Sequence, residues 1–350
     1  MSKVKVLKFI PIDWVSFRKS KNFSTFENTI FPNIKTFYGA IFSAYFRKRG
    51  TKNAIKEIEK MIEEKLINLI GPFIVSERNE IYFRKPANLK LRKICKNENS
   101  CEYEYEYYKG FPCQDSFAVD DKNLRYIKYS NIDNLSEEGI TFISISDLET
   151  FKKSSDKKLY LNLHKYNKNL PFSIERKVGI ALDNKKRMVD KEHGAFYLLS
   201  TYRFRDGAGF GVFIDEKTEQ FLNENKINTV NIGSKGKLAR LEIFEIETDL
   251  FSKESSSKIK GLMLLTPAVF KNGFLPTSEY IRQKIVAVCN YKPEVYSGWD
   301  LKKNKPGKMF RIVPPGSVFF TEEKYLENLE LTEEFNEYNY GKFIVLENCE

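Results

Sequence analysis

The residues best suited to binding an anion form the segment Gly233-Ser-Lys-Gly-Lys237. Glycines allow successive backbone N–H groups to converge on a phosphate, and Lys235 and Lys237 add positive charge. The segment is not a nucleotide-binding P-loop, because Leu238 follows Lys237 and no serine or threonine is available there for a magnesium ion. It predicts a phosphate-contacting loop, and a tight turn between two strands is the alternative.

A second segment, Gly209-Phe-Gly-Val-Phe213, partly matches the strand on which RNA-recognition motifs stack bases. That strand needs a basic residue before the first glycine and a further aromatic residue at its end. Ala208 and Asp215 occupy these two positions. Ordinary packing within a sheet is therefore the favoured interpretation.

Catalytic chemistry has little support in this sequence. His164 and His193 are the only histidines, the five cysteines include no Cys-x-x-Cys pair, and no closely spaced carboxylates suggest a two-metal nuclease. His193, beside Glu192, is the one candidate general base for a metal-independent ribonuclease. We predict no catalytic residue, no metal site and no cofactor.

Charge is distributed unevenly along the 350 residues, whose formal net charge is +11. Residues 1–60 contain 13 Lys or Arg against four Asp or Glu, whereas residues 321–350 contain nine Glu against two Lys. This pattern suits a polyanionic ligand at one end and a basic partner at the other. No apolar run approaches the roughly 18 residues of a membrane helix, and the N-terminus lacks the apolar block of a signal peptide. We therefore expect a cytoplasmic protein with no membrane partner.

Helical periodicity is clearest over residues 34–49, where apolar residues recur at intervals of three and four. Asn33 is a good N-cap, Gly50 follows the last turn, and the helix ends in Arg47-Lys-Arg49. Gly39 interrupts its interior at a cost of about 1 kcal/mol, which suggests that a strand or a ligand approaches the backbone there. We predict a preceding strand over 4–11, a second helix over 53–69, and a hairpin formed by 71–76 and 80–86.

The rest of the chain repeats this alternation of strands and helices. A charged linker over 152–158 and a boundary near Pro171 divide it into modules 1–170 and 171–350, and a tyrosine-rich insertion lies around 90–118. The expected elements of this part are strands over 124–129, 140–145 and 173–182, a hairpin of 195–204 with 210–214, a helix over 216–225, strands over 229–232 and 238–246, a β-rich run over 260–320, a helix over 322–331 and a strand over 343–346. Both halves predict an α+β fold.

The segment Tyr296–Phe320 contains Gly-Trp-Asp, then Lys-Pro, then Arg-Ile-Val-Pro-Pro-Gly-Ser-Val-Phe-Phe. This order resembles the hallmark of the third Cmr subunit of type III-B CRISPR effectors, a family of the RAMP superfamily. Further matching segments run through the chain in order: Pro11–Arg18, Phe31-Pro32, Tyr38-Gly-Ala40, Gly71-Pro-Phe73, Tyr82–Pro86, Glu175–Ile180, Gly194–Tyr197, Tyr202-Arg203 and Leu264–Pro267. Two features depart from the family pattern: a C-terminal glycine loop reduced to Tyr340-Gly-Lys342, and the region 95–113.

The resemblance implies two ferredoxin-like (RRM-like) modules fused in one chain and a non-catalytic role. A subunit of this family would hold the 5′ repeat-derived tag of the guide RNA. It would also dock the large polymerase/cyclase-type subunit and neighbour a backbone RAMP subunit. Two alternatives stay open: a repeat-cleaving RAMP endoribonuclease that uses His193, and a protein-only scaffold subunit.

The predicted RNA-binding residues combine basic side chains with residues of the candidate loops. In the first module they are Arg18, Lys19, Lys35, Tyr38, Gly39, Arg47, Lys48 and Arg49. In the second they are Arg176, Lys177, Lys185, Arg187, Gly233, Ser234, Lys235, Gly236, Lys237, Arg240 and Trp299. For Trp299, a core or interface anchor is an equal alternative to base stacking.

Overall fold

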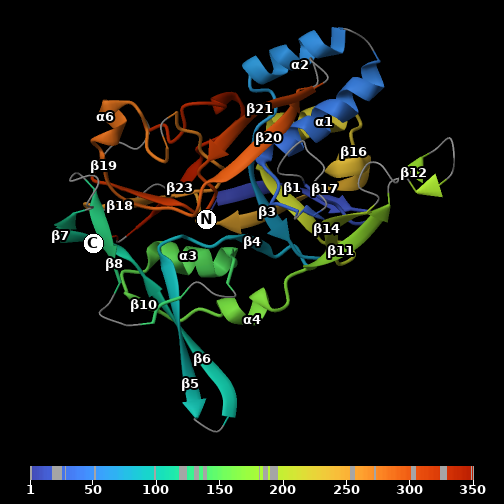
Figure 1. Cartoon of the computed structure of the whole chain (residues 1–350). Helices are drawn as coiled ribbons and strands as arrows, with labels where there is room; N and C mark the ends of the chain where they lie inside the picture. Colours follow the sequence, from blue (N-terminus) through green and yellow to red (C-terminus); the bar gives the residue numbers. More distant parts are fainter. Residues whose placement is uncertain are drawn as a thin grey trace.

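The structure is a computed structural model of the chain (Figure 1). It combines several mostly antiparallel sheets with fewer helices, which is consistent with the predicted α+β class. The residues that it describes are 2–17, 26–27, 29–50, 53–97, 100–117, 124–129, 134–136, 140–180, 182–183, 188–189, 196–252, 257–271, 273–300, 305–323, 329–347 and 349.

The largest sheet has the strand order β16-β17-β1-β15-β3-β4-β9. Its strand β1 pairs antiparallel with β15 on one side and with β17 on the other, where the register runs from Ser2↔Thr248 to Pro11↔Ala239. The strand predicted over 4–11 is thus confirmed. The sheet contains β1 (Ser2–Pro11), β3 (Leu69–Val75), β4 (Ile81–Arg84), β9 (Phe142–Ser144), β15 (Gly209–Ile214), β16 (Thr229–Ile232) and β17 (Lys237–Thr248).

This sheet draws its strands from both sides of the predicted boundary near Pro171. Strands β1 and β3 precede that residue, whereas β15, β16 and β17 follow it. Since β1 is hydrogen-bonded to both β15 and β17, the two sides of the boundary share one continuous sheet.

Strand β15 is buried along its whole length in the middle of the sheet. A Cβ atom at Gly209 would lie 2.0 Å from the Phe9 carbonyl oxygen, and one at Gly211 would lie 2.4 Å from the Phe73 ring. Only glycine fits such close approaches. The favoured interpretation of this segment as a packed strand, rather than a base-stacking surface, is therefore confirmed.

The predicted hairpin of 195–204 with 210–214 is wrong, because β14 (Phe196–Phe204) pairs with β11 (Phe172–Ile180) and β2 (Phe26–Glu27) instead.

Helix α1 (Ile34–Arg49) has the predicted bounds. The Asn33 side chain accepts a hydrogen bond from the Lys35 N–H, and Gly50 closes the helix in the left-handed conformation with φ 63°. Helix α2 (Asn53–Glu63) is shorter than predicted, because Leu69 and the Gly71-Pro72 pair belong to β3. Helix α5 (Glu216–Glu224) confirms the prediction for that segment, and its N-cap is Asp215.

A second sheet has the order β19-β22-β18-β23, and all of its neighbouring strands are antiparallel. It confirms the predicted β-rich run and the predicted strand over 343–346. Its strands are β18 (Lys260–Leu264), β19 (Ile285–Cys289), β22 (Val318–Thr321) and β23 (Phe343–Leu346), and α6 (Glu279–Arg282) lies between β18 and β19. The predicted helix over 322–331 falls largely on residues 324–328, which lie outside the described residues.

Short hairpins and helices surround the two sheets. Strands β5 (Leu89–Asn97) and β6 (Ser100–Lys109) form a long hairpin that projects from the body at the bottom of Figure 1. The remaining elements are β7 (Phe111–Phe117), β8 (Arg125–Lys128), α3 (Ile145–Lys153), β10 (Lys158–Leu159), α4 (Leu163–Asn167), β12 (Leu182–Asp183), β13 (Met188–Val189), the 3-10 turn η1 (Ser234–Gly236), β20 (Glu294–Asp300), β21 (Lys305–Ile312) and the 3-10 turn η3 (Asn336–Tyr338).

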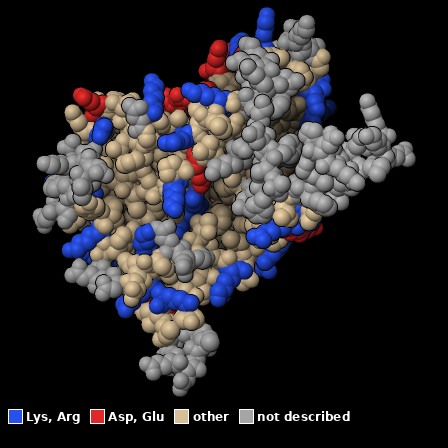
Figure 2. Space-filling model, viewed as in Figure 1, with Lys and Arg blue, Asp and Glu red and all other residues tan. Residues whose placement is uncertain are grey.

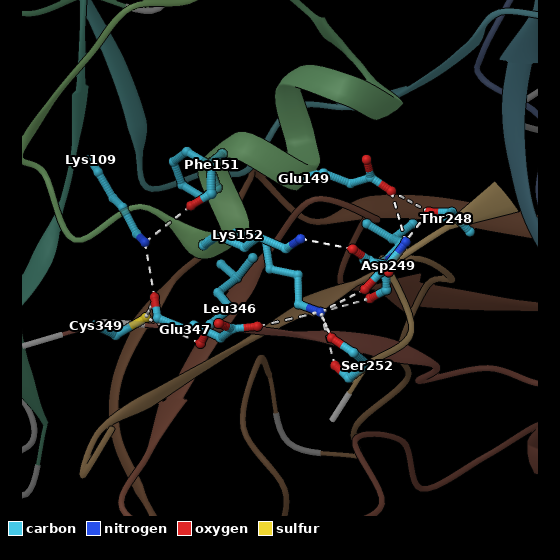
Figure 3. A network of polar contacts seen from close by, with 12 residues as sticks. Lys109, Glu149, Phe151, Lys152, Thr248, Asp249, Ser252, Leu346, Glu347 and Cys349 are labelled. Carbon is cyan, nitrogen blue, oxygen red and sulfur yellow. Dashed lines mark hydrogen bonds and ion pairs between the residues drawn. The ribbon is translucent and has the colours of Figure 1, made fainter. Parts of the chain in front are cut away.

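Two fully buried lysines join distant parts of the chain (Figure 3). Lys109 Nζ donates to the carbonyls of Phe151, Ser154 and Glu347 at 3.1, 2.7 and 3.0 Å. Lys152 was predicted to lie in a charged linker, but it belongs to α3 and is completely buried. A charged side chain can occupy such a position when backbone oxygens replace its hydration, and that is the arrangement around both ammonium groups.

Candidate nucleic-acid interface

The segment Gly233–Lys237 forms the turn between β16 and β17, and it packs against the chain after β1. The Ser234 N–H donates to the Ser16 carbonyl at 2.8 Å, and the hydroxyl groups of the same two serines are also hydrogen-bonded. A Cβ atom at Gly233 would lie 2.7 Å from that carbonyl oxygen, so glycine is needed for this contact. The segment is thus the tight turn that we considered, and its exposed Lys235 stands at the tip. Phosphate binding by the turn stays a prediction.

Trp14 lies directly beside this turn, and the ammonium groups of two lysines lie over its ring. Lys237 Nζ lies 4.0 Å from the ring centroid and Lys177 Nζ lies 4.8 Å from it. Cations over an aromatic face are attracted by its quadrupole. The indole is half-buried, so part of it faces solvent. The sequence analysis gave no role to Trp14. Its position between Asp13 and the Arg18-Lys19 pair could have indicated an RNA-binding aromatic residue.

Ion pairs fix the basic side chains around Trp14. Lys237 Nζ lies 2.9 Å from Asp13 Oδ2, and this hydrogen bond lowers the pKa of the Asp13 carboxyl. Arg203 Nε lies 2.5 Å from Glu175 Oε1, while its Nη1 lies 3.4 Å from Asp13 Oδ1. Exposed pairs of this kind add little stability, but they hold the cations in place.

The basic end of α1 reaches the same turn through Asn231. Arg47 donates to Asn231 Oδ1, and Asn231 Nδ2 donates to the Gly236 carbonyl at 2.7 Å. Lys48 Nζ donates to the carbonyls of Asn225 and Lys226 at 2.8 and 2.5 Å. The structure therefore brings together predicted residues that are far apart in the sequence. We call this set of Trp14, Arg47, Lys177, Arg203 and residues 233–237 the tryptophan surface.

Three predicted residues of α1 lie elsewhere. Tyr38 is 2% exposed, and its hydroxyl accepts hydrogen bonds from the Leu69 N–H and from Asn339 Nδ2, both at 3.0 Å. Its side chain therefore offers no surface to a ligand. Lys35 Nζ lies 4.3 Å from the Phe335 ring centroid. Both Lys35 and Gly39 line a cavity of about 530 Å³ between α1, α2, β20–β21 and η3.

Replacing Gly39 with alanine is expected to stabilise the chain by about 0.5–1 kcal/mol. Apart from its two chain neighbours and the nearby backbone of its own helix, no atom of the described chain lies within 4 Å of a Cβ built at Gly39, and its backbone is helical. Gly50→Ala is a matched control, because its Cβ would also meet open space but its φ is 63°. The control should lower the free energy of unfolding in urea. A loss of stability in Gly39→Ala would contradict the expected gain in helix propensity.

The remaining predicted residues are spread over several elements. Arg176 is exposed on β11, Arg49 lies over the Tyr45 ring, and Arg240 on β17 pairs with Glu242 at 2.9 Å. The backbone of Trp299 pairs with that of Pro306 in the hairpin of β20 and β21, but its side chain lies outside the described residues. The predictions for Arg18, Lys19, Lys185, Arg187 and His193 also fall outside the described residues.

His164 lies on α4 and its ring packs against β6. Its ring stacks on Tyr105 with 4.1 Å between ring centroids, and burial together with Lys168 lowers its pKa. Within the described part of the chain, no group of three or more His, Cys, Asp or Glu side chains could hold a metal ion.

The surface charge of the face in Figure 2 is predominantly basic. Lys and Arg side chains spread through its central hollow and along its lower half, whereas Asp and Glu gather mainly at the upper edge. A polyanion would be attracted over a broad area of this face.

The family model for the CRISPR-associated protein Cas_Cmr3 matches residues 7–345. The chain belongs to the Cas_Cmr3 family. This family is the one that the Tyr296–Phe320 signature resembles, and a Cas_Cmr3 chain is a subunit of a type III CRISPR effector. A comparison with curated proteins found no match.

The fold is similar to that of a chain in a solved type III-B structure. A chain of the cryo-EM structure of the type III-B Cmr-beta bound to cognate target RNA and AMPPnP, state 1, is 16% identical with a TM-score of 0.52, and the match covers 90% of this chain and 86% of that one. A chain of Cmr-beta bound to cognate target RNA is 15% identical with a TM-score of 0.48, covering 91% and 86%. A chain of the Csm3-Csm4 subcomplex in the type III-A CRISPR-Cas interference complex is 15% identical with a TM-score of 0.41, covering 98% of both chains. No helix of the described residues is long and apolar enough to cross a membrane.

Proposed function

We propose that this Cas_Cmr3 chain is a non-catalytic RNA-binding subunit of a type III-B effector and holds the 5′ repeat-derived tag of the guide RNA on its tryptophan surface. The observation that carries the proposal is the Trp14 ring with Lys177 and Lys237 over it, beside the turn 233–237. A base can stack on an exposed part of an indole while nearby lysines bind the flanking phosphates. The family membership supports an RNA ligand for this arrangement.

We also infer that the two sheets belong to two ferredoxin-like units. Taken in chain order, the strands of β17-β1-β15-β3 are the fourth, first, third and second of their set, and those of β23-β18-β22-β19 follow the same order. Helices α1 and α5 fall between the first and second and between the third and fourth strands of the first set, as in a βαββαβ unit. The first unit would then combine 2–75 with 209–248, and the second would be 260–346. The boundary near Pro171 would then fall within residues 76–208, which form an insertion between the two parts of the first unit.

Two protein partners complete the proposal. The large polymerase/cyclase-type subunit and a backbone RAMP subunit would bind outside the tryptophan surface, which leaves the RNA tag accessible during assembly. The acidic residues of 321–350 are suited to a basic surface on one of these partners.

The test measures how tightly the purified chain binds an RNA with the repeat-derived 5′ tag and an RNA with a scrambled tag. Both affinities are measured over a series of salt concentrations. We expect preference for the tag and an affinity that falls steeply with salt, because neutralised phosphates release counterions. Equal binding of both RNAs, or none at any salt concentration, would reject tag capture by the isolated chain and favour the protein-only scaffold.

The endoribonuclease alternative has a separate test. The chain is incubated with repeat RNA in the absence of metal ions, and His193→Ala serves as the control. Under our proposal both proteins leave the RNA intact. A single cut that His193→Ala abolishes would establish the enzyme instead.

A further inference from the structure

The projecting hairpin has an open strand edge. In the sheet β10-β6-β5, the short strand β10 covers only Tyr107 and Tyr108 of β6, because it ends at Leu159. Beyond that point the chain no longer pairs with β6. Within the described residues, no strand pairs with Tyr103–Glu106 on this side.

The hydrogen-bonding direction of this edge follows from its neighbours. The Lys109 N–H donates to the Lys157 carbonyl at 2.9 Å on the β10 side, and the Gly110 N–H donates to Asn88 at 2.8 Å on the β5 side. Backbone groups alternate between the two sides of a strand in an antiparallel sheet. The N–H and C=O groups of Tyr103 and Tyr105 therefore point away from β5 toward the open edge. Glu104 and Glu106 direct theirs toward β5.

A groove runs along this edge. Its volume is about 410 Å³, one wall is Tyr103–Glu106, and the other is the segment Lys158–Asn162 with His164. Tyr160 is 89% exposed and Tyr103 is 41% exposed, which is unusual for aromatic side chains of a folded chain. Aromatic walls beside unpaired backbone groups are the requirements for adding a strand from another protein.

Charge identifies the chemistry of the added strand. Glutamates alternate with tyrosines at 102, 104 and 106 in a chain whose net charge is +11. Glu106 is paired with Lys158, whereas Glu104 is exposed and makes no ion pair with any described residue. A neighbouring strand would therefore present Lys or Arg next to Glu104 on one face, and apolar or aromatic residues next to Tyr103 and Tyr105 on the other.

A second copy of the chain is disfavoured as the occupant. Two β6 edges meeting antiparallel around Tyr105 would set Glu104 of one copy opposite Glu106 of the other. Like charges directly opposite each other destabilise a sheet. A different polypeptide is therefore the favoured partner.

We propose that the open edge of β6 is a docking site for an extended, basic segment of a partner protein, which adds a strand next to Tyr103–Glu106 and extends the line of β10. The contacts would be backbone hydrogen bonds to Tyr103 and Tyr105, a charge pair at Glu104 and aromatic packing against Tyr160. This site is separate from the tryptophan surface and does not depend on RNA binding.

Amide hydrogen exchange and a synthetic peptide test the site on the full chain. The probe is an acetylated peptide of alternating lysine and valine, and its matched control replaces lysine with glutamate. In the free chain, the amides of Tyr103 and Tyr105 should exchange at least 10-fold faster than those of Glu104 and Glu106. The basic peptide should slow the exchange of the two tyrosine amides by a similar factor, and the acidic peptide should not.

Substitutions separate backbone pairing from side-chain contacts. Tyr103→Pro removes an amide that points outward, so it should spare the pairing with β5 and weaken peptide binding at least 10-fold relative to Tyr103→Ala. Glu104→Lys should weaken binding of the basic peptide by at least 5-fold, while the melting temperature shows that the variants are folded. The proposal is overturned if the peptide does not bind, if Tyr103→Pro binds as tightly as Tyr103→Ala, or if the edge is protected by self-association of the free chain.

Discussion

Replacing Lys152 with methionine is expected to lower the free energy of unfolding by about 2–4 kcal/mol. The ammonium group donates to the carbonyls of Asp249 and Ser252 and to the Ser252 hydroxyl at 2.9, 2.9 and 2.6 Å (Figure 3). It also lies 3.6 Å from Glu347 Oε1. Methionine keeps most of the side-chain volume, but it leaves these partly buried oxygens without the ammonium donor. The measurement is urea unfolding followed by circular dichroism.

Lys153 provides the matched control from the same turn of α3. Its side chain is 52% exposed, and its Nζ pairs with Asp249 Oδ2 at 2.9 Å. Because solvent can replace that pair, Lys153→Met should have nearly the stability of the unmodified chain. Equal stability of the two variants would show that Lys152 does not clamp α3 to residues 249–252 and to the C-terminal segment.

Local signals in the sequence predicted local structure well. The bounds of α1 follow from Asn33, the apolar periodicity and Gly50, and the structure reproduces them. Strand β23 also has its predicted bounds, because a short apolar run follows the turn at Gly341. These features depend on neighbours in the sequence, so a single sequence contains the information that specifies them.

Pairing between distant segments was not predicted in the same way. Strand β15 was expected to form a hairpin with the strand before it, but its glycines fit between Phe9 and Phe73 in another sheet. Lys152 looked like part of a solvated linker, since nothing nearby in the sequence reveals the carbonyls of residues 249–252. Periodicity gives the type of an element but not its partner across the fold.

The candidate site shows the same division. Basic residues and a glycine-rich turn were visible in the sequence, and Asn231 brings Arg47 to that turn. Trp14 was missed because its value comes from Lys177 and Lys237, which are more than 160 positions away. Conversely, Tyr38 was predicted to bind RNA, but its side chain is buried and its hydroxyl accepts a hydrogen bond from Asn339.

Removing both Lys235 and Lys237 is expected to weaken binding of the tagged RNA about 10-fold at low salt and to make its salt dependence shallower. For a single strand, each phosphate contact contributes about 0.7 to the slope of log K against log salt, so the slope should change by about 1.4. Binding isotherms of Lys235→Ala/Lys237→Ala over the salt series give both quantities. Lys284→Ala is the matched control. Lys284 Nζ pairs with Glu323 at 2.5 Å and lies 3.9 Å from the Tyr280 ring centroid. This environment resembles that of Lys237, which pairs with Asp13 beside Trp14.

Trp14→Ala completes the comparison, since the indole carries no charge. Stacking of one base contributes about 1–3 kcal/mol, so its loss should weaken binding roughly 5- to 150-fold without changing the salt slope. If the lysine variant keeps the original slope, its side chains do not contact phosphate. If Trp14→Ala binds normally while remaining folded, the base does not stack on Trp14 and the RNA lies elsewhere on the basic face. Different slopes for the two variants would assign phosphate binding to the turn and base stacking to the tryptophan.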